Sequence, residues 1–441
     1  MIKSLLIANR GEIAVRIIRT CRELGIKTVA VYSEADRDAL HVKMADKAYC
    51  IGPPPSAKSY LRMDSLVTVA ANMQCDAIHP GVGFLSENAD FAGLVREHGM
   101  TFIGAKPEVI KALGDKVEAK RIAEEVGIRT IPGSKEAING QVEKAGELAA
   151  EMGYPVIIKA AAGGGGRGMR IVEEPGELAK ALTIAANEAE SNFADGTVYM
   201  EKYLFSPRHV EIQVLGDGRD NVLHLGERDC SVQKNHQKLL EESPSTVVSG
   251  EMREKMGQDA IRLFRHLNYA GAGTIEFLVC EGQYYFMEVN ARVQVEHTVT
   301  EMTTGVDIIR QQILGCVDGK MEVSQDDIRI RGYALEARIN ALTPGLVTKF
   351  EAPLGPMTRT DTFLYSGCNV SPYYDSMVAK IIVQAMTREE GLKRMERALH
   401  ELVIEGIKVN VDEQLTILQS PAFRTGKFGT DVYNKIIAAK K

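Results

Sequence analysis

Residues 273–280 and 283–290 each alternate in the manner of a β-strand, and only two residues separate them. A connection this short joins neighbouring antiparallel strands, so the sequence predicts a β-hairpin. If the ladder is symmetric about Gly282, Glu276 lies directly opposite Glu288. Few other features of the chain limit its fold so tightly, because the hairpin fixes which side chains share a face of the sheet.

Glu276, Glu288 and Asn290 then lie on one face of the predicted hairpin. Two carboxylates that face each other across a sheet repel, and burying them is costly. A divalent cation relieves both costs, and oxygen ligands with room for water and phosphate suit Mg²⁺ or Mn²⁺. These three residues are therefore candidate metal ligands. The alternative is a solvated face with two unrelated glutamates.

Arg292, Gln294 and Glu296 continue the even-numbered series directly after the hairpin. Arg292 can hold a planar anion through two parallel hydrogen bonds, and Glu296 can act as a general base. The segment is a candidate oxyanion site beside the metal. The competing interpretation is an arginine–glutamate ladder on the surface.

A glycine-rich stretch follows the apolar run 156–158 and Lys159. Its glycines allow backbone N–H groups to approach phosphate oxygens closely, and they are Gly163, Gly164, Gly165 and Gly166. The stretch joins two strands, so it is not a Walker A loop. Lys159 at the end of a buried strand favours phosphate binding over a plain hairpin tip.

Other polar residues give weaker signals. Lys116 follows Asp115, a helix-capping residue, and by itself indicates only a surface lysine. The segment Glu201, Lys202 and Leu204 ends a strand, and a hinge of this kind can hold adenine. Four further polar residues lie in or just after strands, as structural residues or anion ligands: His209, Gln233, His236 and Lys238.

The order of patterns predicts an α/β and α+β fold. Strand and helix patterns alternate over residues 1–104, which indicates a doubly wound parallel sheet. Residues 105–129 form a helical linker, and residues 130–203 a small α+β unit. Residues 204–441 are expected to form a C-terminal domain with a long antiparallel sheet that carries the metal site.

Composition excludes several classes of protein. The formal net charge of −6 and the pI near 6.0 argue against a nucleic-acid or anionic membrane surface. No apolar run approaches the length of a membrane span. The seven cysteines are widely spaced without a Cys-x-x-Cys pair, so we expect a cytoplasmic protein.

The chain resembles biotin carboxylase, a family of the ATP-grasp superfamily, over essentially its whole length. Eight segments carry the resemblance: residues 7–14 (IANRGEIA), 79–81 (HPG), 83–88 (GFLSEN), 200–204 (MEKYL), 208–214 (RHVEIQV), 227–231 (ERDCS), 294–297 (QVEH) and 372–377 (PYYDSM). So many matches in order leave little room for chance.

The resemblance implies a role for each candidate residue. Lys116, Lys159 and the glycine loop would hold the phosphates of ATP, Glu201, Lys202 and Leu204 the adenine, and His209, Gln233 and His236 the ribose and phosphate region. Glu276, Glu288 and Asn290 would bind Mg²⁺ or Mn²⁺, with two ions expected. Lys238, Arg292, Gln294 and Val295 would hold bicarbonate, Glu296 would deprotonate it, and Arg338 would stabilise the biotin enolate.

The implied reaction carboxylates biotin through carboxyphosphate, as the first half-reaction of a biotin-dependent carboxylase such as acetyl-CoA carboxylase in fatty acid biosynthesis. No Ala-Met-Lys-Met biotinylation sequence occurs, and no carboxyltransferase domain follows. We therefore expect a homodimeric subunit that works with a biotin carboxyl carrier protein and carboxyltransferase subunits. The alternatives are a subunit of a pyruvate or other 2-oxo acid carboxylase, another ATP-grasp ligase, and an ATP-binding scaffold without turnover.

The chain departs from the usual family pattern at several positions: Val82, Ala162, Asn235, Ala291, Thr298 and the shortened segment 341–350. Val82 replaces a tyrosine expected near the biotin ring. Thr298 replaces the proline of most bacterial subunits and is more similar to pyruvate carboxylases. The shortened segment directly follows Arg338, so the departures gather around the biotin pocket and the docking surface.

Overall fold

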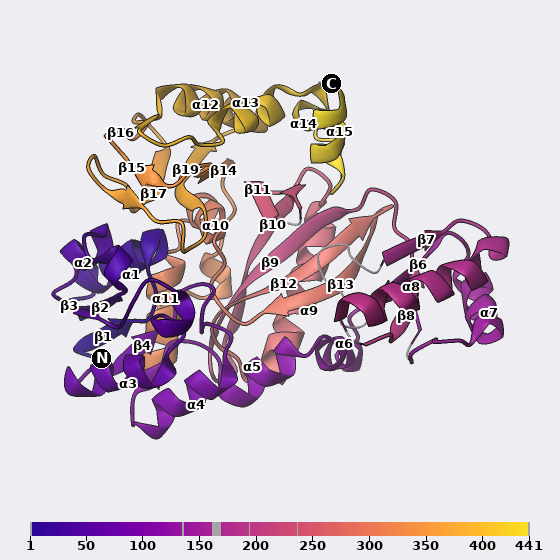
Figure 1. The fold of residues 1–441 in the computed structure, drawn as a ribbon, viewed down its shortest axis with the longest axis horizontal. Helices are drawn as coiled ribbons and strands as arrows, with labels where there is room; N and C mark the ends of the chain where they lie inside the picture. The colour runs from indigo at the N-terminus through magenta and orange to yellow at the C-terminus, as the bar shows by residue number, and fades with distance from the viewer. Residues whose placement is uncertain (1, 135, 161–168, 194, 236, 440–441) are drawn as a thin grey trace.

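The computed structural model describes residues 2–134, 136–160, 169–193, 195–235 and 237–439 (Figure 1). Its N-terminal part is a five-stranded parallel sheet in the order β3-β2-β1-β4-β5. The strands are β1 (Ser4–Ile7), β2 (Lys27–Tyr32), β3 (Lys47–Cys50), β4 (Ala77–His79) and β5 (Thr101–Phe102). The helices that connect them are α1 (Gly11–Glu23), α2 (Leu40–Met44), α3 (Met63–Asn72) and α4 (Ala89–Glu97). The predicted parallel sheet is confirmed.

The strand order reverses at β1 and β4, which is where open parallel sheets of this kind place ligands. Gly11 opens α1 with a φ of +67°, a conformation that suits glycine at the sharp turn from β1 into α1. The amide of Asn9 donates to the carbonyls of Pro80 and Val82, at 2.7 and 2.8 Å. These bonds fasten the loop after β1 to the loop after β4.

A second, eight-stranded antiparallel sheet runs through the middle of the molecule in the order β13-β12-β9-β10-β11-β14-β19-β17. Its strands are β9 (Arg208–Asp217), β10 (Val222–Lys234), β11 (Gln237–Ser243), β12 (Ala270–Cys280), β13 (Gln283–Asn290), β14 (Tyr333–Asn340), β17 (Thr358–Thr362) and β19 (Met377–Ala385). The helices that pack on it are α9 (Gly250–His266), α10 (His297–Thr304), α11 (Ile308–Asp318) and α12 (Arg388–Glu401). The predicted long antiparallel sheet is confirmed.

A small three-stranded sheet, β7-β6-β8, projects to the right in Figure 1. It consists of β6 (Val156–Ala160), β7 (Met169–Val172) and β8 (Val198–Lys202), covered by α7 (Val142–Met152) and α8 (Leu178–Phe193). The unit has an apolar core of its own, which includes Val156, Ile158 and Met200. Helices α5 (Pro107–Gly114) and α6 (Lys116–Glu125) lie between this unit and the N-terminal sheet.

The remaining elements are short. They are β15 (Gly345–Leu346), β16 (Lys349–Glu351), β18 (Asn369–Val370), β20 (Val403–Glu405), α13 (Val411–Gln419), α14 (Pro421–Arg424), α15 (Val432–Ala439) and four 3₁₀ turns at Glu34–Asp36, Ser56–Lys58, Pro175–Glu177 and Gln325–Asp327. Among the described residues, no helix is both long and apolar enough to cross a membrane. The domain boundaries expected near residues 104, 129 and 203 stay a prediction.

The hairpin forms as expected, but its register differs from the assumed symmetry. Glu281 and Gly282 both have positive φ angles, as in a two-residue type I′ turn, and Phe277 therefore pairs with Phe286. A register shift follows, after which Glu276 pairs with Glu288. The assumption of symmetry about Gly282 was wrong near the turn. A one-residue bulge brings the two glutamates opposite each other all the same.

Candidate functional site

A cavity of about 1270 Å³ opens where the central sheet, the small sheet and the loop after β1 meet. Fifteen of the predicted site residues line it: Lys116, Lys159, Lys202, Leu204, His209, Gln233, Lys238, Glu276, Glu288, Asn290, Arg292, Gln294, Val295, Glu296 and Arg338. Glu201 lies behind the lining. Gly163, Gly164, Gly165, Gly166 and His236 lie outside the described residues.

Glu276 is the most heavily bonded carboxylate of the hairpin. Its Oε1 accepts from Lys238 at 3.1 Å, Asn290 at 2.9 Å and Gln294 at 3.0 Å. Its Oε2 lies 2.7 Å from Nε2 of His209. Burial raises the pKa of this carboxyl group, but Lys238 and His209 lower it more, so the pKa ends well below its usual range. Glu276 is therefore ionised at neutral pH.

Glu288 is in the opposite position. It is partly buried, and it accepts no hydrogen bond from any residue that the structure describes. Burial and the charge of Glu276 raise its pKa, and Lys116 offsets only part of this. A carboxylate that is short of positive charge, opposite an ionised one, suits a bound cation. The donor set of Glu276, Glu288 and Asn290 thus fits Mg²⁺ or Mn²⁺.

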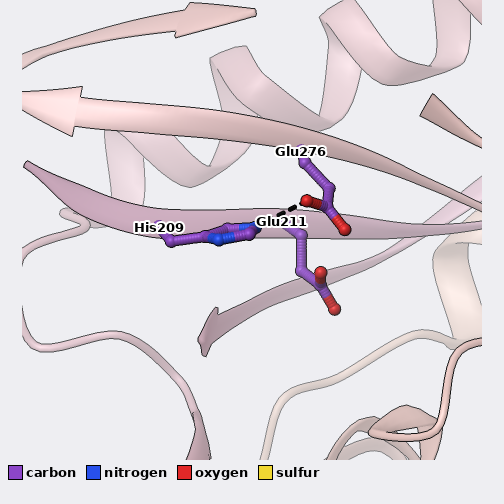
Figure 2. Close-up of side chains that lie close together, drawn as sticks. All are labelled: His209, Glu211 and Glu276. Carbon is purple, nitrogen blue, oxygen red and sulfur yellow. Dashed lines mark ion pairs between the residues drawn. The ribbon is translucent and has the colours of Figure 1, made fainter. Parts of the chain in front are cut away.

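His209, Glu211 and Glu276 come together from β9 and β12, as Figure 2 shows. Their ligand atoms lie within 4.8 Å of one another, which resembles a metal site. However, Nζ of Lys238 lies 2.7 Å from Glu211 and 3.1 Å from Glu276. Because an ammonium group already balances these carboxylates, the position beside Glu288 is the better one for a metal ion.

Glu211 was missed as a site residue by the sequence reasoning. It is fully buried, and its second oxygen accepts from Arg228 at 2.6 Å. A signal was present, since polar residues at 209, 211 and 213 alternate with buried Val210, Ile212 and Val214 along β9. A polar face on a strand buried on both sides indicates a charged network, not a solvated edge.

Lys238 links the metal carboxylate to Glu296. Its Nζ lies 2.6 Å from Oε1 of Glu296, and an N–H of Arg338 donates to Oε2 at 2.9 Å. Burial lowers the pKa of Lys238, but the neighbouring Cys230 thiol and three carboxylates raise it well above its usual value. Burial raises the pKa of Glu296, but Lys238 and Arg338 lower it further, to well below its usual range. The base candidate is therefore held in its ionised form.

Arg292 lies in a fan of acceptors at the end of the hairpin. Its Nε donates to Glu87 at 2.8 Å, and its two terminal nitrogens donate to Asn290 and Gln294, both at 3.0 Å. Glu87, in the loop after β4, also accepts from the backbone N–H of Ala291 at 2.9 Å. Glu87 stood within a recognised motif, but it was not assigned to the site.

The phosphate end of the cavity carries the remaining lysines. Lys116 is exposed at the start of α6, where Asp115 accepts from the N–H groups of Val117 and Glu118, as predicted. Lys159 pairs with Glu201 at 2.5 Å. Lys116 is therefore the more accessible of the two lysines for a phosphate.

The predicted adenine hinge is already engaged in part. The backbone N–H groups of Lys202 and Tyr203 donate to Pro132 and Pro155. The ammonium group of Lys202 donates to the carbonyls of Gly153 and Tyr154. Within the described part of the chain, the N–H of Leu204 has no backbone or side-chain acceptor, so this group remains the candidate donor for an adenine ring.

Three family profiles match the sequence in order. They are the biotin carboxylase N-terminal domain over residues 1–110, the ATP-binding domain of the carbamoyl-phosphate synthase L chain over residues 115–320, and the biotin carboxylase C-terminal domain over residues 331–435. Together with the fold and the carboxylate and lysine groups of the cavity, they define an ATP-grasp ligase.

Comparison with individual proteins narrows this class. The chain is 51% identical to biotin carboxylase 1 of Bacillus subtilis over 440 residues, or 98% of both chains. It is similar to the biotin carboxylase of Campylobacter jejuni in complex with beta-gamma-ATP, with a TM-score of 0.90, 46% identity and 99% of both chains covered. The chain belongs to the biotin carboxylase family, and it is an enzyme.

A further relative comes from a 2-oxo acid carboxylase. The chain is 44% identical to the biotin carboxylase domain of the Hydrogenobacter thermophilus 2-oxoglutarate carboxylase, with a TM-score of 0.90 and coverage of 100% and 99%. That domain is a dimer in complex with MgADP, ADP and bicarbonate.

Proposed function

We propose that this chain uses Mg-ATP and bicarbonate to carboxylate biotin on a separate carrier protein. The observation that carries the proposal is the position of Lys238, whose ammonium group contacts both Glu276 and Glu296, at 3.1 and 2.6 Å. A metal-nucleotide site and an oxyanion site therefore meet across one side chain. This arrangement suits transfer of the γ-phosphoryl group to a small oxyacid.

The nucleotide half of the site binds and orients ATP. Lys116 and Lys159 neutralise phosphate charge, and Glu276 and Glu288 hold the metal ion, with Asn290 beside them. The bound ion supplies neutralisation of the charge that develops on the transferred phosphoryl group. The complex of MgADP and bicarbonate in the relative from Hydrogenobacter thermophilus supports this assignment.

The oxyanion half binds bicarbonate between Arg292, Gln294, Lys238 and the segment at Val295. Glu296 takes the proton of bicarbonate, and a bicarbonate oxygen attacks the γ-phosphorus, which yields carboxyphosphate and ADP. Carboxyphosphate releases CO₂, and its phosphate takes the N1′ proton of biotin, so that N1′ attacks CO₂. Arg338 stabilises the enolate oxygen of the ureido group. The small unit, residues 130–203, covers the nucleotide and excludes water from the labile anhydride.

The assignment extends to partners and compartment. We propose a homodimer that meets a biotin carboxyl carrier protein and hands its product to carboxyltransferase subunits. The dimer of the Hydrogenobacter thermophilus domain supports self-association. All seven cysteines are free thiols, which suits the cytoplasm.

The final carboxyl acceptor has two candidates. Most of the similar curated proteins carry the name biotin carboxylase, which suits acetyl-CoA carboxylase or another acyl-CoA carboxylase. The second candidate is a 2-oxo acid. One of the two chains of the pyruvate carboxylase of Methanothermobacter thermautotrophicus is 46% identical over 451 residues, with all of this chain and 92% of that protein covered. Thr298 points the same way.

The rate of ADP release tests the proposal. With Mg-ATP present, we expect ADP release to need bicarbonate and to rise when free biotin is added. Glu296→Gln should abolish bicarbonate-dependent turnover and leave ATP binding intact. Glu413→Gln, which removes a carboxylate paired with Lys234 away from the site, is the matched control and should retain the rate. ADP release that ignores biotin would exclude the proposed acceptor.

A further inference from the structure

One face of the central sheet, beneath helix α10, carries charged side chains that the proposed reaction does not use. Glu241 on β11 and Glu336 on β14 are direct cross-strand partners, and both are fully buried. Two carboxyl groups in this position repel and lose their hydration. A buried glutamate pair needs a reason to persist, and Arg338 lies two residues after Glu336 on the same face of β14.

Glu241 holds one edge of the Arg338 guanidinium. The Nε of Arg338 donates to Oε1 of Glu241 at 2.5 Å, and one terminal nitrogen donates to Glu296 at 2.9 Å. The other terminal nitrogen, Nη1, donates to no described residue, and Arg338 lines the cavity. A planar guanidinium fixed at Nε by one carboxylate presents its far edge in one direction. Glu241 therefore controls where Arg338 points.

The pair has spare acceptors and a local surplus of acid. Oε2 of Glu241 and Oε1 of Glu336 are buried, and neither has a hydrogen-bond partner among the described residues. The other oxygen of Glu336 accepts from the hydroxyl group of Thr298 in α10. A carboxyl proton on either residue would reduce the repulsion between them.

The charged and titratable groups that face this pair come from four elements: Lys238 from β11, Arg338 from β14, Lys380 from β19 and Glu296 from the start of α10. Burial raises the pKa of Glu241 to about 8 although Arg338 lowers it. Burial likewise raises the pKa of Glu336 to about 7 although Lys380 and Arg338 lower it. The direction agrees with the geometry, because both carboxyl groups resist ionisation.

We propose that Glu241 is a positioning residue for Arg338 and that Glu241 and Glu336 share one proton in the active enzyme. With one proton, the pair carries a single negative charge, and Arg338 divides its donors between Glu241, Glu296 and the cavity. Loss of the proton adds a second charge behind Arg338 and draws the guanidinium away from the substrate. This inference rests on the proposed function, in which Arg338 acts on biotin.

The first test separates the two halves of the reaction. Glu241→Ala should lower the biotin-dependent rate by about 10- to 100-fold, the range expected for a misplaced catalytic group. ATP cleavage without biotin should change by less than about threefold, because Arg338 acts in the second half. Glu241→Gln keeps the shape and an acceptor for Nε, so it should retain most of the rate.

Glu242→Gln is the matched control. Glu242 is the next residue on β11 and just as buried, but it pairs with Arg388 and Tyr333 and not with Arg338. Thermal unfolding should show that all four proteins are folded. If the wild-type enzyme does not respond to biotin, the proposed function fails. If it does respond but Glu241→Ala and Glu242→Gln behave alike, the positioning role fails.

The second test concerns the shared proton. The kcat/KM for biotin of the wild-type enzyme should fall on the alkaline side of neutrality as the pair loses its proton. Glu336→Gln leaves a single carboxyl group that can stay ionised at every pH, so this alkaline fall should disappear or move by at least about one pH unit. Glu242→Gln should keep the wild-type profile. An identical alkaline fall in the wild-type enzyme and Glu336→Gln would overturn the shared proton.

Discussion

Lys238→Met should destabilise the protein through the carboxylates that it leaves behind. Nζ of Lys238 lies 2.6, 2.7 and 3.1 Å from Glu296, Glu211 and Glu276. Removing one partner of a buried ion pair costs about 3–5 kcal/mol. Each of the three carboxylates keeps a second cationic or imidazole neighbour, so we expect the lower end, about 3 kcal/mol.

Urea unfolding followed by circular dichroism suits this measurement, because the chain contains no tryptophan. Lys234→Met is the matched control from the same hairpin. Lys234 pairs with Glu413 at 2.6 Å, but its side chain is 41% exposed, so solvent screening limits its loss to about 0–1 kcal/mol.

The pH dependence of the loss has a definite sign. The folded-state pKa values of Glu276 and Glu296 are lowered, so their stabilisation is present above the unfolded pKa of about 4.3 and is lost as the pH falls further. Without Lys238 these carboxyl groups take up protons at higher pH, which relieves the variant. The gap between wild type and Lys238→Met should therefore narrow from pH 7.5 to pH 5. A loss below about 1 kcal/mol, or a gap that widens over this range, would refute the reasoning.

Three further predictions concern the metal, a helix cap and a thiol. Glu288→Gln should raise the free Mg²⁺ needed for half-maximal activity at least about tenfold, because one anionic ligand is lost; an unchanged Mg²⁺ dependence would remove Glu288 from the metal site. Asp115→Ala should cost about 1 kcal/mol in urea unfolding and weaken ATP binding, since the cap that starts α6 also places Lys116; unchanged ATP affinity would contradict the phosphate role. Burial raises the pKa of the Cys230 thiol well above its usual value, so mass spectrometry at pH 7.5 should find exposed Cys50 alkylated well before Cys230; the reverse order would contradict the burial of Cys230.

The parts of the fold that follow local patterns could be predicted from the sequence. The parallel strands, the helix capped by Asp115 and the hairpin all depend on short-range periodicity and turn chemistry. The bulge after Phe277 could not be predicted, because it depends on how both strands of the hairpin pair with their neighbours. The pairing of Glu276 with Glu288 was correct for a reason that included one wrong step.

The candidate site was predicted where its residues are close in sequence, as between Glu276 and Glu296. The partners that come from distant elements were missed: Glu87, Glu211, Glu241 and Glu336. Each lies opposite or behind an assigned residue, so its part in the site depends on strand order and register. Charged residues inside a strand that is otherwise apolar are the one local signal that could have found Glu211.

Transfer of labelled carbon from bicarbonate to biotin tests the central claim most directly. The enzyme is incubated with Mg-ATP, ¹³C-bicarbonate and free biotin, and mass spectrometry measures carboxybiotin against ADP. The account predicts labelled carboxybiotin in step with ADP, bicarbonate dependence of both products, and loss of both in Glu296→Gln. ADP formation without labelled biotin would contradict it.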